Sequence, residues 1–330
     1  MPRRRVAWSS WRTTASILAE PLRVVHCPVN TAGVPWANVQ ALRRRGVDAQ
    51  LVVFNAESAH PEADLDLHLP KDPAWRRQAL QFRALAKLLP RTDVFHFYFG
   101  LTLVPKRFQF PILKAARKKS VFHFVGSDIR GKSPDELAYG RLADAQIVGS
   151  YDAARWVPEA EVVPPGIDLR AIEPVPPRSD GPLRVAHAAL SRRRKGTDLI
   201  VAACEELGVE LDVIENVRHD EVGPRLAQAD VVVDQLNSGW YGLFAIEAMA
   251  YGKPVVGYIH EEAATRTAAG FGVELPIART TKETLTADLR PLLESAEDRR
   301  ARGAAGRTYV ERVHDADAMA DRLIDIYSRL

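Results

Sequence analysis

Hydrophobic residues in this chain gather in short runs rich in Val and Phe, and the segments between the runs show helical spacing of apolar positions. The runs that predict buried strands are residues 23–27, 50–54, 93–99, 120–125, 146–149, 161–163, 183–190, 210–214, 230–236 and 254–259. Nearly continuous apolar strands that alternate with helices are typical of parallel sheets covered on both faces. The pattern therefore predicts an α/β protein.

A proline-rich segment divides these strands into two sets. Residues 164–182 contain six prolines and two glycines, which cannot continue a helix or a central strand. At 330 residues the chain also exceeds the usual size of one hydrophobic core. We expect two doubly wound, Rossmann-like domains, residues 1–163 and 183–315, that face each other across a cleft. An apolar stripe in residues 316–330 predicts a last helix that packs back across the domain boundary.

The composition is that of an ordinary globular protein, with 46% hydrophobic and 26% charged residues. Two distant cysteines, Cys27 and Cys204, predict neither a disulfide framework nor a metal site, and they favour a reducing, cytoplasmic compartment. No apolar stretch is long enough to span a bilayer. The basic N-terminus superficially resembles a signal peptide, but Arg12 and Glu20 interrupt its apolar part, so we expect a basic arm instead.

Charge is distributed unevenly between the two halves. Residues 1–180 hold 26 Lys and Arg against 18 Asp and Glu, whereas residues 181–330 hold 19 against 24. The basic half predicts a solvated face, an anionic membrane surface or a phosphate-bearing acceptor. The basic segment 75–89 carries Trp75 and Phe82, which indicates either weak attachment to anionic lipid or packing against the sheet. Nucleic acid is not expected, because no nucleic-acid-binding motif accompanies the charge.

Residues 230–257 predict a buried strand, a glycine-bracketed loop, a short helix and a second strand. In the helix, which begins at about Gly242, Glu247 lies on the same stripe as apolar Leu243 and Ile246. A carboxylate among core-facing positions is costly unless it has a partner. Two interpretations stay open: Glu247 binds the vicinal hydroxyls of a ribose, or an Arg or Lys from elsewhere holds it.

Three strand-to-helix loops could meet a ligand. Gly33 lets a backbone approach a ligand at the start of a helix. The four consecutive cations 192–195 precede a helix for which Thr197 is the expected N-cap. The helix dipole disfavours cations there, so the loop predicts either a diphosphate-binding site or an exposed basic loop. In the third loop, residues 241–243 offer backbone N–H groups to a phosphate or sugar.

The second half resembles the retaining nucleotide-sugar glycosyltransferases of family 4, which have the GT-B fold. The resemblance rests on residues 187–197 with their Lys-Gly pair and on residues 239–256, which contain Glu-Ala-Met-Ala-Tyr-Gly-Lys-Pro-Val. Residues 163–168 resemble the segment that joins the domains in that family. The similarity covers residues 160–260 and extends more loosely into the first half.

The resemblance implies a role for each donor-site residue. Lys195 and Arg192 would neutralise the donor diphosphate, and Glu247 would accept hydrogen bonds from the ribose. The backbone of Tyr241, Gly242 and Leu243 would hold the distal phosphate and the donor sugar. Gly33 would let the first domain reach the same phosphates from across the cleft.

No metal is expected, because cations and helix dipoles commonly replace it in such enzymes. The pair Asp64 and Asp66 could suggest a metal motif, but we interpret it as part of an acidic loop. No cofactor is expected either: a nicotinamide-dependent oxidoreductase would need a Gly-x-Gly-x-x-Gly segment after a strand, which the chain lacks.

Two positions depart from the family. The first glutamate of its pair is replaced by Gly239, so the sugar contact must come from another group such as Gln235, or the sugar class differs. The histidine before Gly-Ser-Asp is replaced by Val125, while His123 lies two residues earlier on the same strand face. His123 is either a substitute catalytic residue or a core histidine. Beyond the strand, Asp128 is the second candidate catalytic residue; Arg130, His96 and Tyr98 are further candidates for the cleft.

These observations predict glycosyl transfer from a nucleotide-diphosphate sugar to a small-molecule, glycan or lipid-linked acceptor, with retention implied by the resemblance. The alternatives are a catalytically weakened nucleotide-sugar-binding partner or sensor, and a GT-B-fold epimerase. The expected location is cytoplasmic, with peripheral contact at the inner membrane face as an open alternative.

Overall fold

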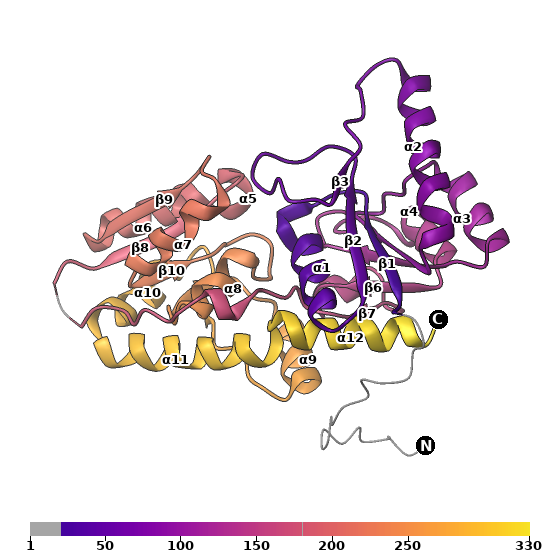
Figure 1. Ribbon diagram of the computed structural model, residues 1–330. Helices are drawn as coiled ribbons and strands as arrows, with labels where there is room; N and C mark the ends of the chain where they lie inside the picture. Colours follow the sequence, from indigo (N-terminus) through magenta and orange to yellow (C-terminus); the bar gives the residue numbers. More distant parts are fainter. Residues whose placement is uncertain (1–20, 180) are drawn as a thin grey trace.

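The computed structural model describes residues 21–179 and 181–330, which form two α/β domains side by side (Figure 1). The first has a seven-stranded parallel sheet in the order β3-β2-β1-β4-β5-β6-β7, and the second a five-stranded parallel sheet in the order β12-β11-β10-β8-β9. The expected basic arm and the would-be signal segment lie outside the described residues. The predicted α/β class with two doubly wound domains is confirmed.

The bounds of the elements follow in chain order. The strands are β1 (Arg23–Cys27), β2 (Asp48–Val53), β3 (Leu65–Asp66), β4 (Val94–Tyr98), β5 (Lys119–Phe124), β6 (Ala145–Val148), β7 (Glu161–Val162), β8 (Arg184–Ala188), β9 (Glu210–Ile214), β10 (Val231–Val233), β11 (Val255–Gly257) and β12 (Ala278–Arg279). The α-helices are α1 (Val34–Arg44), α2 (Ala74–Leu88), α3 (Lys106–Ala115), α4 (Pro134–Leu137), α5 (Arg192–Lys195), α6 (Thr197–Leu207), α7 (His219–Gln228), α8 (Leu243–Ala250), α9 (Glu261–Phe271), α10 (Leu285–Glu294), α11 (Ala296–Val313) and α12 (Ala316–Ser328).

The acidic stretch that contains Asp64 and Asp66 is not the loop that we expected. It forms β3, which pairs with the end of β2 at the edge of the sheet. Asp64 accepts a hydrogen bond from the Leu51 amide at 2.7 Å and forms an ion pair with Arg43 at 2.7 Å. Both contacts are structural, and a two-residue strand is too short to show an alternating pattern in the sequence.

Each sheet reverses its order of strand addition at one point, between β1 and β4 in the first domain and between β8 and β10 in the second. In open parallel sheets, ligands bind outside the carboxyl ends of the strands at such a point. The loops that follow β1 and β4, and those that follow β8 and β10, are therefore the segments that the fold presents to a ligand.

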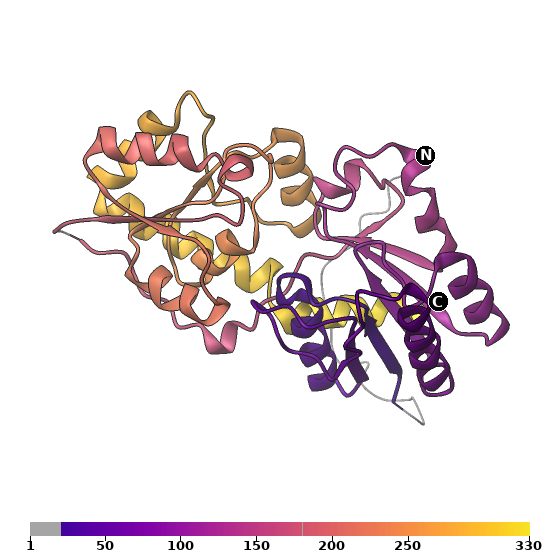
Figure 2. The same cartoon turned by 90° about the horizontal axis from the view of Figure 1, so that it is seen from above.

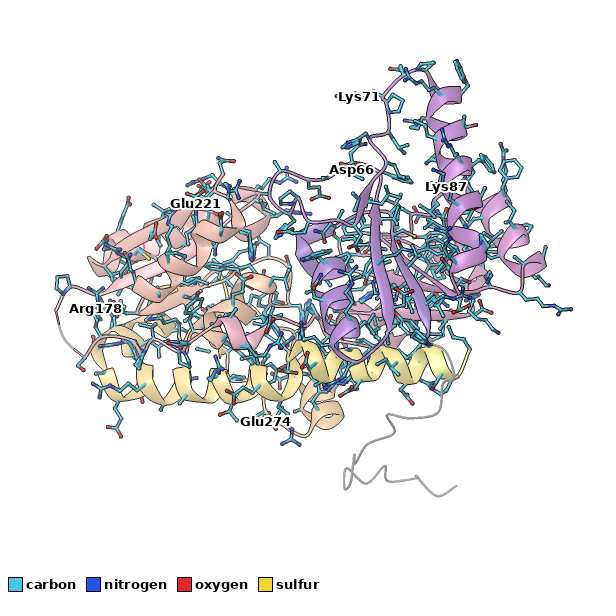
Figure 3. All side chains as sticks on the ribbon, in the orientation of Figure 1. Asp66, Lys71, Lys87, Arg178, Glu221 and Glu274 are labelled. Carbon is cyan, nitrogen blue, oxygen red and sulfur yellow. The ribbon has the colours of Figure 1, made fainter. Side chains whose placement is uncertain are left out.

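The chain crosses between the domains twice, and the two crossings are hydrogen-bonded to each other. The amide of Ile167 donates to the His314 carbonyl at 2.9 Å, and the amide of Ala316 donates to the Ile167 carbonyl at 3.1 Å. At the outer end of the second domain (Figure 3), Arg178 forms an ion pair with Asp230 at 2.6 Å, which fixes the proline-rich segment to the second sheet.

After the second crossing, α12 lies beneath the first domain and contacts α1 (Figures 1 and 2). Its buried side chains join the core formed by β1, β2, β4 and α1: Met319, Ala320, Leu323, Ile326 and Tyr327. Ion pairs from Arg44 to Asp317 and from Arg45 to Asp321 border this contact. The last helix therefore belongs to the core of the first domain, although it follows the second domain in sequence. Within the described residues, no helix is long and apolar enough to cross a membrane.

Candidate functional site

A cavity of about 370 Å³ lies between the domains and is lined by both of them. Its size falls in the range of small-molecule sites. The lining residues of the first domain include Gly33, Trp36, His60 and Glu62, the joining segment adds Asp168, and those of the second domain include His219, Gly223, Leu243, Glu247 and Tyr251. Of the expected donor-site residues, the structure thus brings Gly33, Leu243 and Glu247 to one cavity.

The first-domain wall consists of two loops that Asn30 joins. The buried Asn30 side chain donates to the carbonyls of His60 at 3.2 Å and Glu62 at 3.0 Å, and it accepts from the Trp36 amide at 3.2 Å. Gly33 precedes α1 with φ +71°, a backbone conformation that disfavours other residues, and a Cβ there would lie 2.8 Å from His60 Nδ1. Glycine is thus required for the two loops to pack together at the cavity.

The domains touch at the cavity through two histidines. The rings of His60 and His219 lie 4.8 Å apart, one from each domain. Burial lowers the pKa of His60, and the neighbouring His219 lowers it further. A neutral His60 at neutral pH avoids a charge in this contact.

Glu247 lies in the cavity on α8, and its partner is a histidine, not an Arg or Lys. Its Oε1 is 3.5 Å from Nε2 of the half-exposed His219. Burial raises the pKa of Glu247, and His219 acts in the opposite direction. Among the described residues no Arg or Lys forms an ion pair with Glu247, so its carboxylate oxygens face the cavity with a single weak partner.

Lys195 is held at the start of α8 by Asp234, a residue that the sequence patterns did not single out. Lys195 Nζ lies 2.6 Å from Asp234 Oδ1, and Asp234 Oδ2 accepts from the Gly242 amide at 2.8 Å. Asp234 is buried and directly follows β10. Its place after an apolar strand at the reversal point was the signal that could have indicated it.

This arrangement changes which amides at the start of α8 can meet a ligand. The Gly242 amide is taken by Asp234, and the Ala245 amide bonds the Gly242 carbonyl at 3.1 Å. The first N–H groups of a helix have no partner within it, so the amides of Leu243 and Phe244 remain for a ligand. The Tyr241 side chain points into the core. Its hydroxyl lies 2.8 Å from the Tyr309 hydroxyl and 3.0 Å from Nε2 of His314.

The basic segment 192–195 and the start of the helix that follows it differ from what we expected. Arg192 to Lys195 form the short helix α5 with Ser191 as N-cap, and Gly196 with φ +79° separates it from α6. Thr197 is therefore not the N-cap that we expected. Its side chain is turned to the buried His187, with Oγ1 2.9 Å from Nε2.

Arg192 already has two carboxylate partners in this structure. It forms ion pairs of 3.0 Å with Asp198 and with Glu215 on the exposed side of the loop. Arg192 would have to leave these partners to bind a diphosphate. Lys195 has three N–H donors and one carboxylate partner, so it can also donate to a diphosphate.

Gly239, at the position of the missing glutamate, packs against the ring of His260. Its φ is +71°, and a Cβ there would overlap the imidazole. The His260 amide also donates to the Gly239 carbonyl at 2.8 Å. Gln235 does not serve as a replacement sugar contact, because its amide group bonds the carbonyls of Trp240 and Tyr258 and the amides of Asn237 and Ser238.

His123 belongs to a buried network on one face of the first sheet. Its Nδ1 lies 3.1 Å from His96 Nε2, and His96 Nδ1 lies 2.6 Å from the hydroxyl of Tyr327 on α12. His26 and Tyr98 join the network at 2.8 Å. Burial lowers the pKa values of His26 and His123 to about 3. The imidazoles are therefore neutral and serve to join α12 to the sheet.

Asp128, the other candidate catalytic residue, follows β5 at the carboxyl edge. Its Oδ1 accepts from the amides of Val125 at 3.0 Å and Gly126 at 2.8 Å. Its Oδ2 is buried and has no hydrogen-bond partner among the described residues. Arg130 is turned away to Asp152, at 3.2 Å. Within residues 21–179 and 181–330, no three His, Cys, Asp or Glu side chains gather to hold a metal ion.

No protein-family model matches the chain, and no curated protein matches it in sequence. Solved structures do match. Sucrose-phosphate synthase from Thermosynechococcus elongatus is 16% identical with a TM-score of 0.65, over 94% of this chain and 98% of that one. Anabaena HepE in complex with UDP-glucose is 14% identical with a TM-score of 0.65, over 94% and 100%. The lipopolysaccharide outer core galactosyltransferase WaaB is 13% identical with a TM-score of 0.60, over 94% and 100%.

At these identities the likeness concerns the fold. It extends over nearly the full length of both chains, so it includes both domains. The chain therefore has the GT-B fold, two parallel-sheet domains around a cleft, as found in these glycosyltransferases.

Proposed function

We propose that the protein transfers a sugar from a nucleotide-diphosphate donor to an acceptor hydroxyl. The observation that carries this proposal is the Lys195–Asp234–Gly242 cluster beside the cavity. A buried carboxylate holds one ammonium group over the first turn of a helix, and both the ammonium and the free helix amides attract a diphosphate. The GT-B fold and the binding of UDP-glucose by Anabaena HepE support the same donor class.

The nucleoside end of the donor is assigned to the cavity. Glu247 offers carboxylate oxygens to the ribose hydroxyls, and His219 orients them from α7. At the same wall the Tyr251 hydroxyl fills the space beside Gly223, where a Cβ would lie 2.6 Å from that oxygen. Burial of Glu247 is costly without donors, and two ribose hydroxyls would supply them.

The reaction breaks the bond between the sugar C1 and the diphosphate oxygen and forms a bond between C1 and the acceptor oxygen. Negative charge develops on the leaving diphosphate, and Lys195 with the amides of Leu243 and Phe244 would stabilise it. The proton of the acceptor hydroxyl passes to a base at the edge of the first sheet, for which Asp128 has the free oxygen. Retention of configuration and independence of metal remain part of this proposal.

The donor sugar would lie beside His260. The overlap between His260 and any Cβ at position 239 means that the imidazole fills the space where a longer side chain would project. His260 can donate or accept one hydrogen bond, whereas a glutamate accepts. We therefore propose a sugar contact of different chemistry at this position.

Location is part of the proposal: we propose a cytoplasmic enzyme with weak peripheral contact at the inner membrane face. Trp75 on α2 is 71% exposed, and Phe82 packs edge-on against the exposed Phe108 of α3 at 5.8 Å. Arg76 and Arg77 lie beside them. Aromatic rings next to cations favour the surface of an anionic bilayer.

The test is release of nucleoside diphosphate from a panel of UDP-, GDP- and ADP-sugars, with mono- and oligosaccharides as acceptors. The proposal expects release from at least one donor, with faster release when an acceptor is present. Tight binding of one donor with no turnover would instead favour the nucleotide-sugar-binding partner or sensor. Failure of every nucleotide to bind would contradict the donor site itself.

A further inference from the structure

A second group of polar side chains lies at the carboxyl edge of the first sheet, outside the cavity. Lys106 is the first residue of α3 after β4, and Asp128 lies four residues beyond the end of β5. Because β4 and β5 are neighbours and parallel, both residues emerge at one edge. Lys132 and Tyr139, which follow in the chain, complete the group.

Lys106 packs on Tyr139, and a glycine makes this contact fit. Lys106 Nζ lies 4.3 Å from the centre of the Tyr139 ring. The Tyr139 hydroxyl occupies the space above Gly100, whose φ is +62° and where any Cβ would overlap that oxygen. Lys106 is half-buried in this position. The ammonium group is thus positioned by the aromatic ring and not by a carboxylate.

The two lysines are not held by a carboxylate at ion-pair distance, although the charge of Lys132 acts on Asp128 and opposes the rise in the pKa of Asp128 on burial. Among the described residues, neither Lys106 nor Lys132 forms an ion pair within 4 Å. Burial lowers the pKa of Lys106, and the charge of Lys132 lowers it further. The nearby Glu136 carboxylate is already occupied by the amide and hydroxyl of Ser133 at 2.9 and 3.0 Å. Two unpaired cations that repel each other are stabilised by an anion.

Asp128 adds a hydrogen-bond acceptor to the two cationic lysines of this group. Its Oδ1 is held by two backbone amides, while Oδ2 is buried without a partner and the residue is 7% exposed. A buried acceptor without a donor costs about 1–3 kcal/mol. Burial, and to a smaller extent the negative charge of Asp128, raise the pKa of Tyr139 to about 12. The Asp128 carboxylate and the Tyr139 hydroxyl therefore lie near each other.

We propose that this edge binds an acceptor substrate that carries both an anionic group and a free hydroxyl. Lys106 and Lys132 bind the anion, a phosphate or a carboxylate, and Asp128 Oδ2 accepts the hydrogen of the hydroxyl that attacks the donor sugar. This inference rests on the proposed function, and it restricts the acceptor to anionic molecules.

The placement agrees with a transfer between the two sites. The cavity begins at the loop after β1, and β5 lies two strands from β1 in the sheet. At the usual spacing of neighbouring strands this distance is about 10 Å. An acceptor bound over β4 and β5 can therefore present its hydroxyl to a sugar that projects from the cavity.

The test is calorimetric titration of glucose 6-phosphate and of glucose into the full chain, with the donor site first saturated with UDP, GDP or ADP. We expect glucose 6-phosphate to bind at least about tenfold more tightly than glucose. The Lys106→Gln/Lys132→Gln double variant should bind both sugars equally. The matched control Lys114→Gln, an exposed lysine on α3, should behave as wild type.

Vesicles of phosphatidic acid, compared with phosphatidylcholine, identify the source of the anion. Loss of retention in the double variant but not in Lys114→Gln assigns the site to a lipid-borne phosphate, and binding of glucose 6-phosphate alone assigns it to a soluble acceptor. No preference for the phosphate in either experiment would overturn the inference. Nucleoside diphosphate binding, measured in the same titrations, separates that result from failure of the donor site.

Discussion

Both domains place histidines, cations and carboxylates near the carboxyl ends of parallel strands, but the two sets have different fates. In the second domain, Lys195 and Asp234 form a charged pair at the start of α8, the helix whose residues Leu243 and Glu247 line the cavity. In the first domain, His96 and His123 bond to each other, His26 bonds to Tyr98, and both His26 and His96 bond to Tyr327 of α12 in a buried network. The charged pair of the second domain is available to a ligand, whereas each of these histidines has a hydrogen-bond partner within the protein.

Residue type at a strand end does not by itself indicate a catalytic group. His123 is 3% exposed, and its ring nitrogen has a partner from the neighbouring strand. Glu247 is also largely buried, yet it faces a cavity with a half-exposed histidine at 3.5 Å as its ion-pair partner. Unfilled hydrogen-bonding capacity next to a cavity distinguishes the two cases.

The largest expected effect is the acid sensitivity of the histidine network. Because burial holds the pKa values of His26 and His123 at about 3, below the ordinary 6.5, the unfolded chain binds more protons below pH 6.5. The free energy of unfolding therefore falls as pH drops from 6.5 towards 3, by about 1.4 kcal/mol per pH unit for each such histidine.

Denaturant unfolding at pH 7, 6 and 5 measures this slope. His123→Gln should reduce the dependence of the unfolding free energy on pH by about 1.4 kcal/mol per pH unit, the contribution of one histidine. This change is independent of any effect of the substitution on stability at pH 7. The same substitution at the exposed His68 is the control for replacing a histidine outside the network. An unaltered slope in His123→Gln would show that His123 is not held neutral by the fold.

The next effect concerns Lys195. Lys195→Ala should lower turnover by about 10²–10³-fold, the range for loss of one preorganised electrostatic donor. Arg193→Ala, an exposed cation two residues away, is the matched control and should stay near wild type. Steady-state kinetics measured beside thermal unfolding separates an effect on catalysis from an effect on folding. Turnover within about threefold of wild type would refute the role.

A smaller effect is expected for Glu247. Glu247→Gln should weaken nucleoside diphosphate binding by about tenfold, or about 1.4 kcal/mol. Because burial raises the pKa of Glu247, its ionised form is destabilising once the pH exceeds the unfolded value, so the neutral amide should not lower the unfolding temperature at pH 7. A marked loss of stability with unchanged nucleotide affinity would instead identify Glu247 as a structural residue.

The sequence indicated the fold well where its signals were local. All strands of four or more residues coincide with apolar runs, and the Lys195 and Glu247 segments lie on the predicted loop and helix. The strands β3 and β12 have two residues each, which is too short for a recognisable apolar pattern in the sequence. Asp234 could not be paired with Lys195 from the sequence, because the two residues are 39 positions apart and only the fold brings them together. The packing of His260 on Gly239 is non-local in the same way.

The smallest effect is expected at the surface of α2. Trp75→Ala should reduce retention on anionic vesicles by about threefold at low salt, where electrostatic attraction is strongest. Leu142→Ala removes another exposed apolar side chain, away from α2, and serves as the control. If wild type is not retained at all, the proposed membrane contact is wrong, while the donor site is unaffected.

In the proposed function, the Lys195–Asp234–Gly242 cluster of the second domain binds the donor, and the histidine network of the first domain does not. Calorimetric titration of UDP, GDP and ADP into wild type, Lys195→Ala and His123→Gln tests it most directly. We expect that wild type binds at least one of them, that Lys195→Ala binds it at least about tenfold more weakly, and that the affinity of His123→Gln stays within about twofold of wild type. Loss of binding in His123→Gln with retention in Lys195→Ala would contradict the account.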